Sequence, residues 1–581
     1  MPACGSIDPS GTDKAGAHGS AAVEAVDETR TVDKQSVGCY AMTVWITLRT
    51  EADIDADLMR SRTEAGSLAG IRLAVKDNVD AAGLPTTAAC PEYAYQPAAD
   101  AAAVAALKSA GAVVVGKTNL DQFATGLVGT RSPYGAVSDS RRPEYISGGS
   151  SSGSAVAVAT GDADIAIGTD TAGSGRVPAG LQGIVGIKPT VGVISTQGVV
   201  PACESYDCVT IFARDLELAN RAMAAMAAAG DRRWPADTRL AAPPNPVVAV
   251  PSSLPELDEH FQAAFHAAVD TLVADGVRIV TVDIEPFLTA AKLLYNGGLV
   301  SERYAAVGEF IDGNPDAALD PTVARIVTAA RDVPAHQLIA DRREVQRLRS
   351  IAMAQLDGVD ALLVPTAPFH PLIDEVNADP VGVNSRMGTY TNFCNLFDMC
   401  AVAVPTGTAG DSQFGVTVLA RAFEDAVALD IAAIAAKTEA PQQAWPLAAA
   451  DTTELVVFGA HLRGGALVHQ LTDVGARWGG EITTAPHYRM TRLTSSPPKP
   501  IVSRVADGTE GVGLKGQIWQ LSPAALGRFL AALPAPMQLG KVEFDDGSWR
   551  TAFGGGIAPA DSGVDISGYG GWEAAIAAGA V

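Results

Sequence analysis

Apolar and polar positions along the chain alternate between short buried runs and helix-like patterns. Six mainly apolar runs have the length of buried strands and lie at residues 70–80, 112–116, 247–250, 278–284, 361–368 and 400–407. Between them, residues 100–110 form an alanine-rich helical pattern and residues 258–276 an amphipathic one. Strands and helices that alternate in this way are typical of βαβ units. The pattern therefore predicts an α/β fold whose sheet is largely parallel.

The pattern changes near the last quarter of the chain. Residues 439–453 contain prolines and many alanines without apolar periodicity, which is typical of a linker. Beyond them come short strand-like runs and one well-marked helix, with Ser522 as N-cap and Pro523 in its first position. We therefore expect a large domain over residues 45–438 and a small α+β domain over residues 454–581. Residues 1–44 have few large apolar side chains and are predicted to be a disordered tail.

Composition and charge exclude several classes of protein. The 581 residues carry a formal net charge of -23, which argues against a general nucleic-acid or anionic-membrane binder because no basic face is available. The start of the chain lacks a basic segment followed by an apolar one, and no apolar run reaches the ~20 residues of a membrane span. The seven cysteines lack the paired spacing of a zinc site. We expect a cytoplasmic protein, in which an anionic substrate would need a local cation.

Residues 147–178 carry the strongest indication of chemistry. The stretch SGGSSSGSAVAVATGDADIAIGTDTAGSGRVP consists of a glycine- and serine-rich loop, a helix of small residues, a short strand and a second glycine-serine turn. Tight turns of this kind expose hydroxyl groups and backbone N–H groups, which a nucleophile and an oxyanion hole require. We interpret the stretch as an active site.

The general base for such a nucleophile is not a nearby histidine. No histidine lies between residues 19 and 259, a G-x-S-x-G pattern centred on Ser151 has no evident preceding strand, and H-E-x-x-H does not occur. Lys76 lies in the apolar run 70–80, and a buried lysine has a lowered pKa that allows it to act as a base. The alternative is a lysine at the end of a strand whose amine reaches solvent.

The buried lysine, GGSSSGS and GTDTAGS occur in the order found in the amidase signature family, which residues 68–437 resemble. The resemblance implies a fold with a central mixed, largely parallel sheet covered by helices, and a Ser-cisSer-Lys triad that needs no cofactor or metal. Carried over, the triad is Lys76, Ser150 and Ser174. The implied oxyanion hole is formed by the backbone of Thr171, Ala172, Gly173 and Ser174. Asp170 and Arg176 are interpreted as braces of this turn, and Ser151 and Ser152 as hydrogen-bonding support.

Further segments resemble the allophanate hydrolases within that family. These are KTNLDQFATGLVGTRSPYG at residues 117–135, the nucleophile turn, and a second domain after a linker. The resemblance implies hydrolysis of the terminal carboxamide of allophanate, with release of ammonia and of N-carboxycarbamate that decarboxylates. Tyr295 and Arg303, expected on one helix, would bind the substrate carboxylate, and Gly126 would let the backbone approach the substrate. His461 is a candidate site in the C-terminal domain, with a structural histidine as the alternative.

Partners and competing functions complete the expectations. The protein is expected to act on a small-molecule substrate as a homodimer, with functional coupling to a urea carboxylase and no nucleic-acid or membrane partner. The alternatives are a glutaminase of the kind that supplies ammonia within glutamyl-tRNA amidotransferases, a broad aliphatic or aryl amidase, and an inactive scaffold. The extra C-terminal domain and the Tyr295/Arg303 pair argue against the first, and a complete triad argues against the last.

Overall fold

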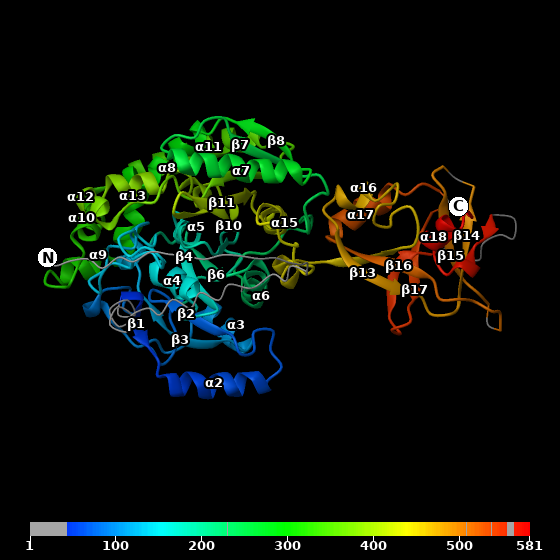
Figure 1. Cartoon of the computed structure of the whole chain (residues 1–581), viewed down its shortest axis with the longest axis horizontal. Helices are drawn as coiled ribbons and strands as arrows, with labels where there is room; N and C mark the ends of the chain where they lie inside the picture. Colours follow the sequence, from blue (N-terminus) through cyan, green and yellow to red (C-terminus); the bar gives the residue numbers. More distant parts are fainter. Residues whose placement is uncertain (1–42, 229, 495, 507, 536, 555–562) are drawn as a thin grey trace, which may run out of the picture. The chain divides into compact units, whose positions relative to one another are not determined.

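The computed structural model describes residues 43–228, 230–494, 496–506, 508–535, 537–554 and 563–581 (Figure 1). The predicted disordered tail over residues 1–44 therefore lies almost wholly outside the described residues. In the described part of the chain, no helix has the length and apolar character needed to cross a membrane.

One large sheet organises the described residues before the C-terminal part. Its eleven strands, in spatial order, are β1 Trp45–Leu48, β3 Val113–Thr118, β2 Arg72–Lys76, β4 Ile165–Asp170, β6 Cys208–Ala213, β5 Val185–Lys188, β10 Cys400–Ala409, β11 Ser412–Ala420, β9 Ala361–Pro365, β7 Val247–Pro251 and β8 Arg278–Val282. The expected strands are thus present, and the prediction of a mixed sheet covered by helices is confirmed.

The share of parallel pairing is smaller than the sequence pattern suggested. Parallel neighbours occur at two places, β3–β2–β4 and β9–β7–β8, whereas the strands between these groups pair antiparallel. For one of these antiparallel pairs the reason is local. The strands β10 and β11 are separated by a two-residue turn and form a hairpin, and a connection this short permits only antiparallel pairing.

Helices cover both faces of this sheet. They are α2 Glu51–Thr63, α3 Ala102–Ser109, α4 Ser152–Thr160, α5 Val177–Gln182, α6 Leu216–Ala227, α7 Glu259–Ala274, α8 Glu285–Asn296, α9 Ser301–Gly313, α10 Pro321–Ala329, α11 Ala335–Gln355, α12 Ile373–Ala378, α13 Gly382–Met387, α14 Phe393–Leu396 and α15 Asp425–Ala435. Successive residues of β9, Leu362 and Leu363, belong to two different apolar cores, as period-two alternation requires when both faces are buried. Figure 1 shows α7, α8 and α11 gathered around β7 and β8.

The C-terminal part is rich in short strands. A five-stranded sheet has the order β13 Arg477–Thr483, β16 Lys515–Leu521, β12 Thr453–Val457, β18 Trp549–Phe553 and β17 Leu539–Glu543, and a three-stranded sheet the order β15 Lys499–Arg504, β14 Tyr488–Leu493 and β19 Val564–Asp565. The helices are α16 His469–Thr472, α17 Pro523–Ala531 and α18 Trp572–Ala577. Ser522 occupies the N-cap position of α17, although its hydroxyl makes no capping hydrogen bond.

The segment expected to be a linker, residues 439–453, is not wholly exposed. Trp445, which begins a short 3-10 helix ending at Ala448, is 1% exposed and belongs to an apolar core that also contains β2 and β10 residues. Ala444, Leu447 and Ala449 pack into or against the same core, but their spacing along the chain follows neither a helix nor a strand period, which explains why the sequence pattern indicated a linker.

Candidate active site

Lys76 ends β2 and is completely buried. Its Nζ donates to Oγ of Ser150 at 2.8 Å and to Oγ1 of Thr169 at 2.7 Å. Burial lowers the pKa of Lys76 to about 7, while the charges of Asp121, Asp207 and Asp170 oppose that fall. The alternative of an amine that reaches solvent is therefore excluded, and a neutral lysine is available near neutral pH.

Ser150 and Ser174 continue the line of hydrogen bonds from Lys76. The Gly149–Ser150 peptide is cis, and Oγ of Ser150 donates to Oγ of Ser174 at 3.0 Å. Oγ of Ser174 also lies 3.4 Å from the carbonyl oxygen of Gly126. When Lys76 loses its extra proton the direction of donation can reverse, so that Ser174 donates to Ser150 and Ser150 to Lys76.

Asp121 holds the two loops that carry these groups, and sequence reasoning missed it. Its buried carboxylate accepts the backbone N–H groups of Val128 at 3.2 Å and of Gly129 and Arg131 at 3.0 Å each. Its own N–H donates to the carbonyl oxygen of Ser150 at 3.1 Å. A Cβ added at Gly126 or Gly149 would collide with Oδ2 of Asp121, so both positions require glycine. Asp121 lies three residues after the end of β3, and nothing in the neighbouring sequence marked this role.

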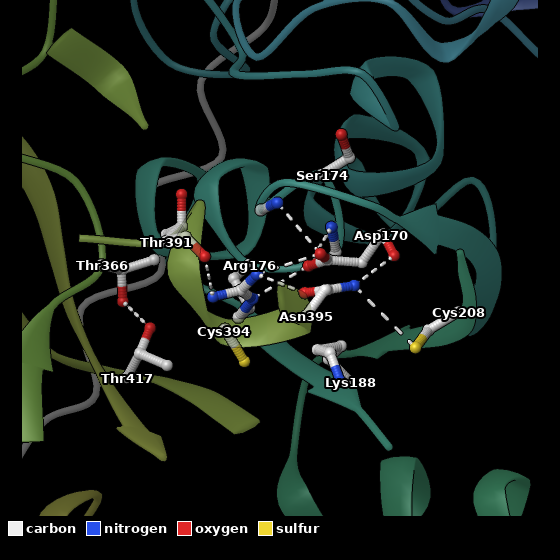
Figure 2. Close-up of polar contacts among 12 residues, drawn as sticks. Asp170, Ser174, Arg176, Lys188, Cys208, Thr366, Thr391, Cys394, Asn395 and Thr417 are labelled. Atoms are coloured by element: carbon white, nitrogen blue, oxygen red, sulfur yellow. Dashed lines mark hydrogen bonds and ion pairs between the residues drawn. The ribbon is translucent and has the colours of Figure 1, made fainter. Parts of the chain in front are cut away.

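The turn that carries Ser174 is braced from below by a buried ion pair (Figure 2). Nε and Nη2 of Arg176 each donate to the carboxylate of Asp170 at 2.9 Å, and neither side chain is exposed. Burial alone would raise the pKa of Asp170, but Arg176 holds it below its usual value. Asn395 accepts from Arg176 at 3.2 Å and donates to the carbonyl oxygen of Asp170 at 2.8 Å. The expected bracing role of Asp170 and Arg176 agrees with this geometry.

The backbone donors available for an oxyanion are fewer than the sequence suggested. The N–H of Gly173 is committed to Oδ1 of Asp170 at 2.9 Å, whereas those of Thr171, Ala172 and Ser174 have no partner within the described residues. Gly173 adopts a φ of +139°, which favours glycine, while Ala172 keeps a negative φ that suits its Cβ. The turn can therefore present three N–H groups rather than four.

Tyr295 and Arg303 come together from two helices, not from one as expected. Tyr295 lies near the end of α8 and Arg303 in the first turn of α9, because extended backbone at Gly297 interrupts the helix. Arg303 is 2% exposed and donates to the Tyr295 hydroxyl at 3.3 Å and to Oγ1 of Thr125 at 3.0 Å. No carboxylate of the described residues forms a salt bridge with it. A buried guanidinium of this kind is a ready partner for an anionic ligand.

Comparison with known sequences identifies the family. The sequence model of the amidase family, described as Amidase, matches residues 22–429. The chain belongs to the amidase family. The allophanate hydrolase C-terminal domain matches residues 453–577.

Two relatives by sequence and one solved structure show which members of the family the chain resembles. The urea amidolyase of Lachancea kluyveri is 40% identical over 567 residues, which make up 91% of this chain and 31% of that protein. The chain thus spans about a third of the length of that relative. A glutamyl-tRNA(Gln) amidotransferase subunit of Natronomonas pharaonis is 31% identical, covering 63% of this chain and 94% of that protein. Kluyveromyces lactis allophanate hydrolase has a solved structure with a TM-score of 0.82 and 37% identity, covering 92% of this chain and 93% of that chain. The predicted resemblance and fold class are confirmed.

His461 lies in an aromatic environment in the C-terminal part of the amidase. Its ring stacks on Phe553 with centroids 5.2 Å apart and meets the edge of Phe529 at 5.3 Å, and Nε2 lies 3.0 Å from Oε1 of Gln470. Burial lowers the pKa of His461, which favours its neutral form. These contacts favour the alternative of a structural histidine.

Asp207 is a second residue that sequence reasoning missed. The Thr171 hydroxyl donates to its carboxylate, which also accepts the backbone N–H of Ala202 at 2.8 Å and that of Cys203. It is buried, and its charge acts on both Lys76 and Arg303. Its position at the end of a loop, directly before β6, gave no signal in the sequence.

Proposed function

We propose that this amidase hydrolyses the terminal carboxamide of allophanate, using Lys76, Ser150 and Ser174 as its catalytic triad. The observation that carries the proposal is Arg303, a buried cation without a carboxylate partner in the described residues, in contact with Thr125 directly before the loop residue Gly126. Allophanate is a small ureide that carries a carboxylate, and the guanidinium with the Tyr295 hydroxyl matches that planar anion.

The reaction begins when neutral Lys76 takes a proton from Ser150, which takes the proton of Ser174. Ser174 attacks the carboxamide carbon, and the N–H groups of Thr171, Ala172 and Ser174 stabilise the developing oxyanion. The proton returns along the same line to the leaving nitrogen, so that ammonia departs and an acyl-enzyme forms. Water then hydrolyses the ester by the same relay and releases N-carboxycarbamate, which loses carbon dioxide.

The supply of the substrate follows from its chemistry. Allophanate is a carboxylated urea, so a reaction that carboxylates urea, or one that opens a ring compound, must form it. We include functional coupling to a urea carboxylase, a homodimeric state and a cytoplasmic location in the proposal. The C-terminal part, residues 454–581, is proposed to be an accessory domain that follows a catalytic domain over residues 45–438.

The test is ammonia release by the purified protein from a panel of allophanate, biuret, glutamine and malonamate, without added metal or nucleotide. We expect turnover of allophanate to exceed that of glutamine, and Ser174→Ala to abolish it with an unchanged circular dichroism spectrum. Efficient turnover of glutamine or simple amides without turnover of allophanate would contradict the proposed substrate and favour one of the alternatives.

A further inference from the structure

The segment between Asp121 and Gly126 has an unusual backbone conformation. Phe123 and Ala124 have positive φ angles of 51° and 53°, in the left-handed region that residues with a side chain rarely adopt. Both residues are buried, so the conformation is not that of a loose surface turn. Backbone strain of this kind persists only where surrounding contacts hold it, and it occurs preferentially at functional sites.

Several hydrogen bonds hold this segment and fix the position of Thr125. The N–H of Phe123 donates to the carbonyl oxygen of Ala88 at 3.0 Å, and the N–H of Thr125 donates to that of Gln122 at 3.0 Å. The carbonyl oxygen of Thr125 accepts Nη1 of Arg131 at 2.9 Å. The Thr125 hydroxyl donates to the carbonyl oxygen of Phe123 at 3.2 Å. Because its proton is used in this bond, the hydroxyl is left to act as an acceptor.

The guanidinium and the nucleophile contact this segment at two consecutive residues. Nη1 of Arg303 donates to the Thr125 hydroxyl at 3.0 Å, and Oγ of Ser174 lies 3.4 Å from the carbonyl oxygen of Gly126. A single peptide unit therefore joins the two contacts. Apart from the N–H groups directed at Thr125 and Tyr295, those of Arg303 have no hydrogen-bond partner among the described residues. They are sufficient to bind a carboxylate.

We propose that Thr125 is a positioning residue that sets the distance between Arg303 and Ser174 and thereby selects short substrates. Its hydroxyl holds the guanidinium, and its peptide link to Gly126 fixes the distance to the nucleophile. The inference rests on the proposed function, in which Arg303 binds the carboxylate of the molecule whose carboxamide Ser174 attacks. Allophanate and malonamate have one atom between these two groups. Succinamate has two, so it cannot place both groups correctly at once.

The test varies the length of the ligand with and without the Thr125 hydroxyl. The unsubstituted protein should prefer malonamate to succinamate by about 10- to 100-fold in kcat/KM, and malonate should inhibit better than succinate by a similar factor. Thr125→Val keeps the shape of the side chain and removes the acceptor for Arg303. Both preferences should then fall at least about fivefold, through a higher KM for malonamate and a higher inhibition constant for malonate, with kcat changed less than about threefold. Thr125→Ser keeps the hydroxyl and should restore both preferences.

A buried threonine that does not contact the guanidinium provides the matched control. The hydroxyl groups of Thr366 and Thr417 lie 2.9 Å apart (Figure 2). Thr366→Val removes a buried hydroxyl of the same kind, so it should lower the melting temperature and leave both length preferences unchanged. If Thr125→Val behaves in the same way, or lowers the turnover of malonamate and succinamate equally, Thr125 is only structural and the inference is wrong. Failure of Thr125→Ser to restore the preferences would also overturn it.

Failure of the proposed function would give a different result. If the unsubstituted protein is not inhibited by malonate and hydrolyses no amide that carries a carboxylate, Arg303 does not bind a substrate carboxylate, and the function and the inference both fail. Efficient turnover of malonamate over succinamate without turnover of allophanate would contradict the proposed substrate alone. Loss of that preference in Thr125→Val would then still support the role of Thr125.

Discussion

The proton relay predicts a pH profile that depends on Asp121. Only neutral Lys76 can accept the proton of Ser150, and its pKa of about 7 sets the neutral fraction. About half of the molecules are active at pH 7, about a tenth at pH 6 and about a hundredth at pH 5. The acidic limb of kcat/KM should therefore have a midpoint near 7 and a slope of one.

Substitution of Asp121 by asparagine removes one of the three carboxylate charges that raise the pKa of Lys76. Protonated Lys76 then becomes less favourable, so its pKa falls and the acidic limb moves to lower pH. The new amide has one acceptor oxygen, whereas the two carboxylate oxygens accept three N–H groups at 3.0–3.2 Å. Loss of one such bond costs roughly 1–3 kcal/mol, so the variant should fold with a lowered melting temperature.

The assay is ammonia release over pH 5 to 9 for the unsubstituted protein and Asp121→Asn, with melting temperatures measured at each pH. A purely structural role for Asp121 would lower activity at every pH and leave the midpoint in place. An unmoved midpoint, or one displaced to higher pH, would refute the electrostatic reasoning. A midpoint above about 9 in the unsubstituted protein, close to the ordinary pKa of a lysine, would refute the lowered pKa of Lys76.

Three further substitutions test other parts of the site. Ser150→Ala should lower kcat by a factor on the order of 10³ and leave malonate binding unchanged, since it interrupts the relay but not the carboxylate contact; weaker malonate inhibition would contradict this. Arg303→Ala should raise the malonate inhibition constant and the KM for allophanate more than about 100-fold, and unchanged values would remove Arg303 from the site. Gly149→Ala should abolish activity and lower the melting temperature because its Cβ collides with Asp121; near-normal ammonia release and melting would refute the glycine requirement.

The sequence identified the residues whose chemistry is unusual for their surroundings. Lys76 stands out because it is a charged residue in an apolar run, and Ser150 and Ser174 because they follow paired glycines and a tight turn. The strands β2, β3 and β4 were expected because each contains a short apolar run bounded by polar and turn residues. The local sequence pattern was sufficient to select these residues as candidates. Their individual roles in the triad came from the family resemblance.

Residues that act across long separations could not be found in this way. Asp121 meets Gly149 and Asn395 meets Asp170 and Arg176 only after the sheet has formed, and nothing in their immediate neighbours indicates those contacts. At Gly297 the sequence pattern instead predicted too much regular structure. The sequence allowed a continuous helix from Tyr295 to Arg303, but the extended backbone at that glycine turns the chain so that the two side chains can still meet.

The buried carboxylates give Lys76 a basicity that burial alone would not. Burial favours the neutral amine, and a fully desolvated lysine is too weak a base to hold the proton that leaves Ser174. Asp121 and Asp207 accept backbone N–H groups, and neither forms a salt bridge with Lys76 in the described residues, so their charges raise its proton affinity without competing for the hydrogens that it donates to Ser150 and Thr169. The same charges stabilise the ammonium that forms as Ser174 attacks. The site therefore combines an apolar enclosure, which keeps the base neutral at rest, with fixed negative charge that stabilises the protonated state during reaction.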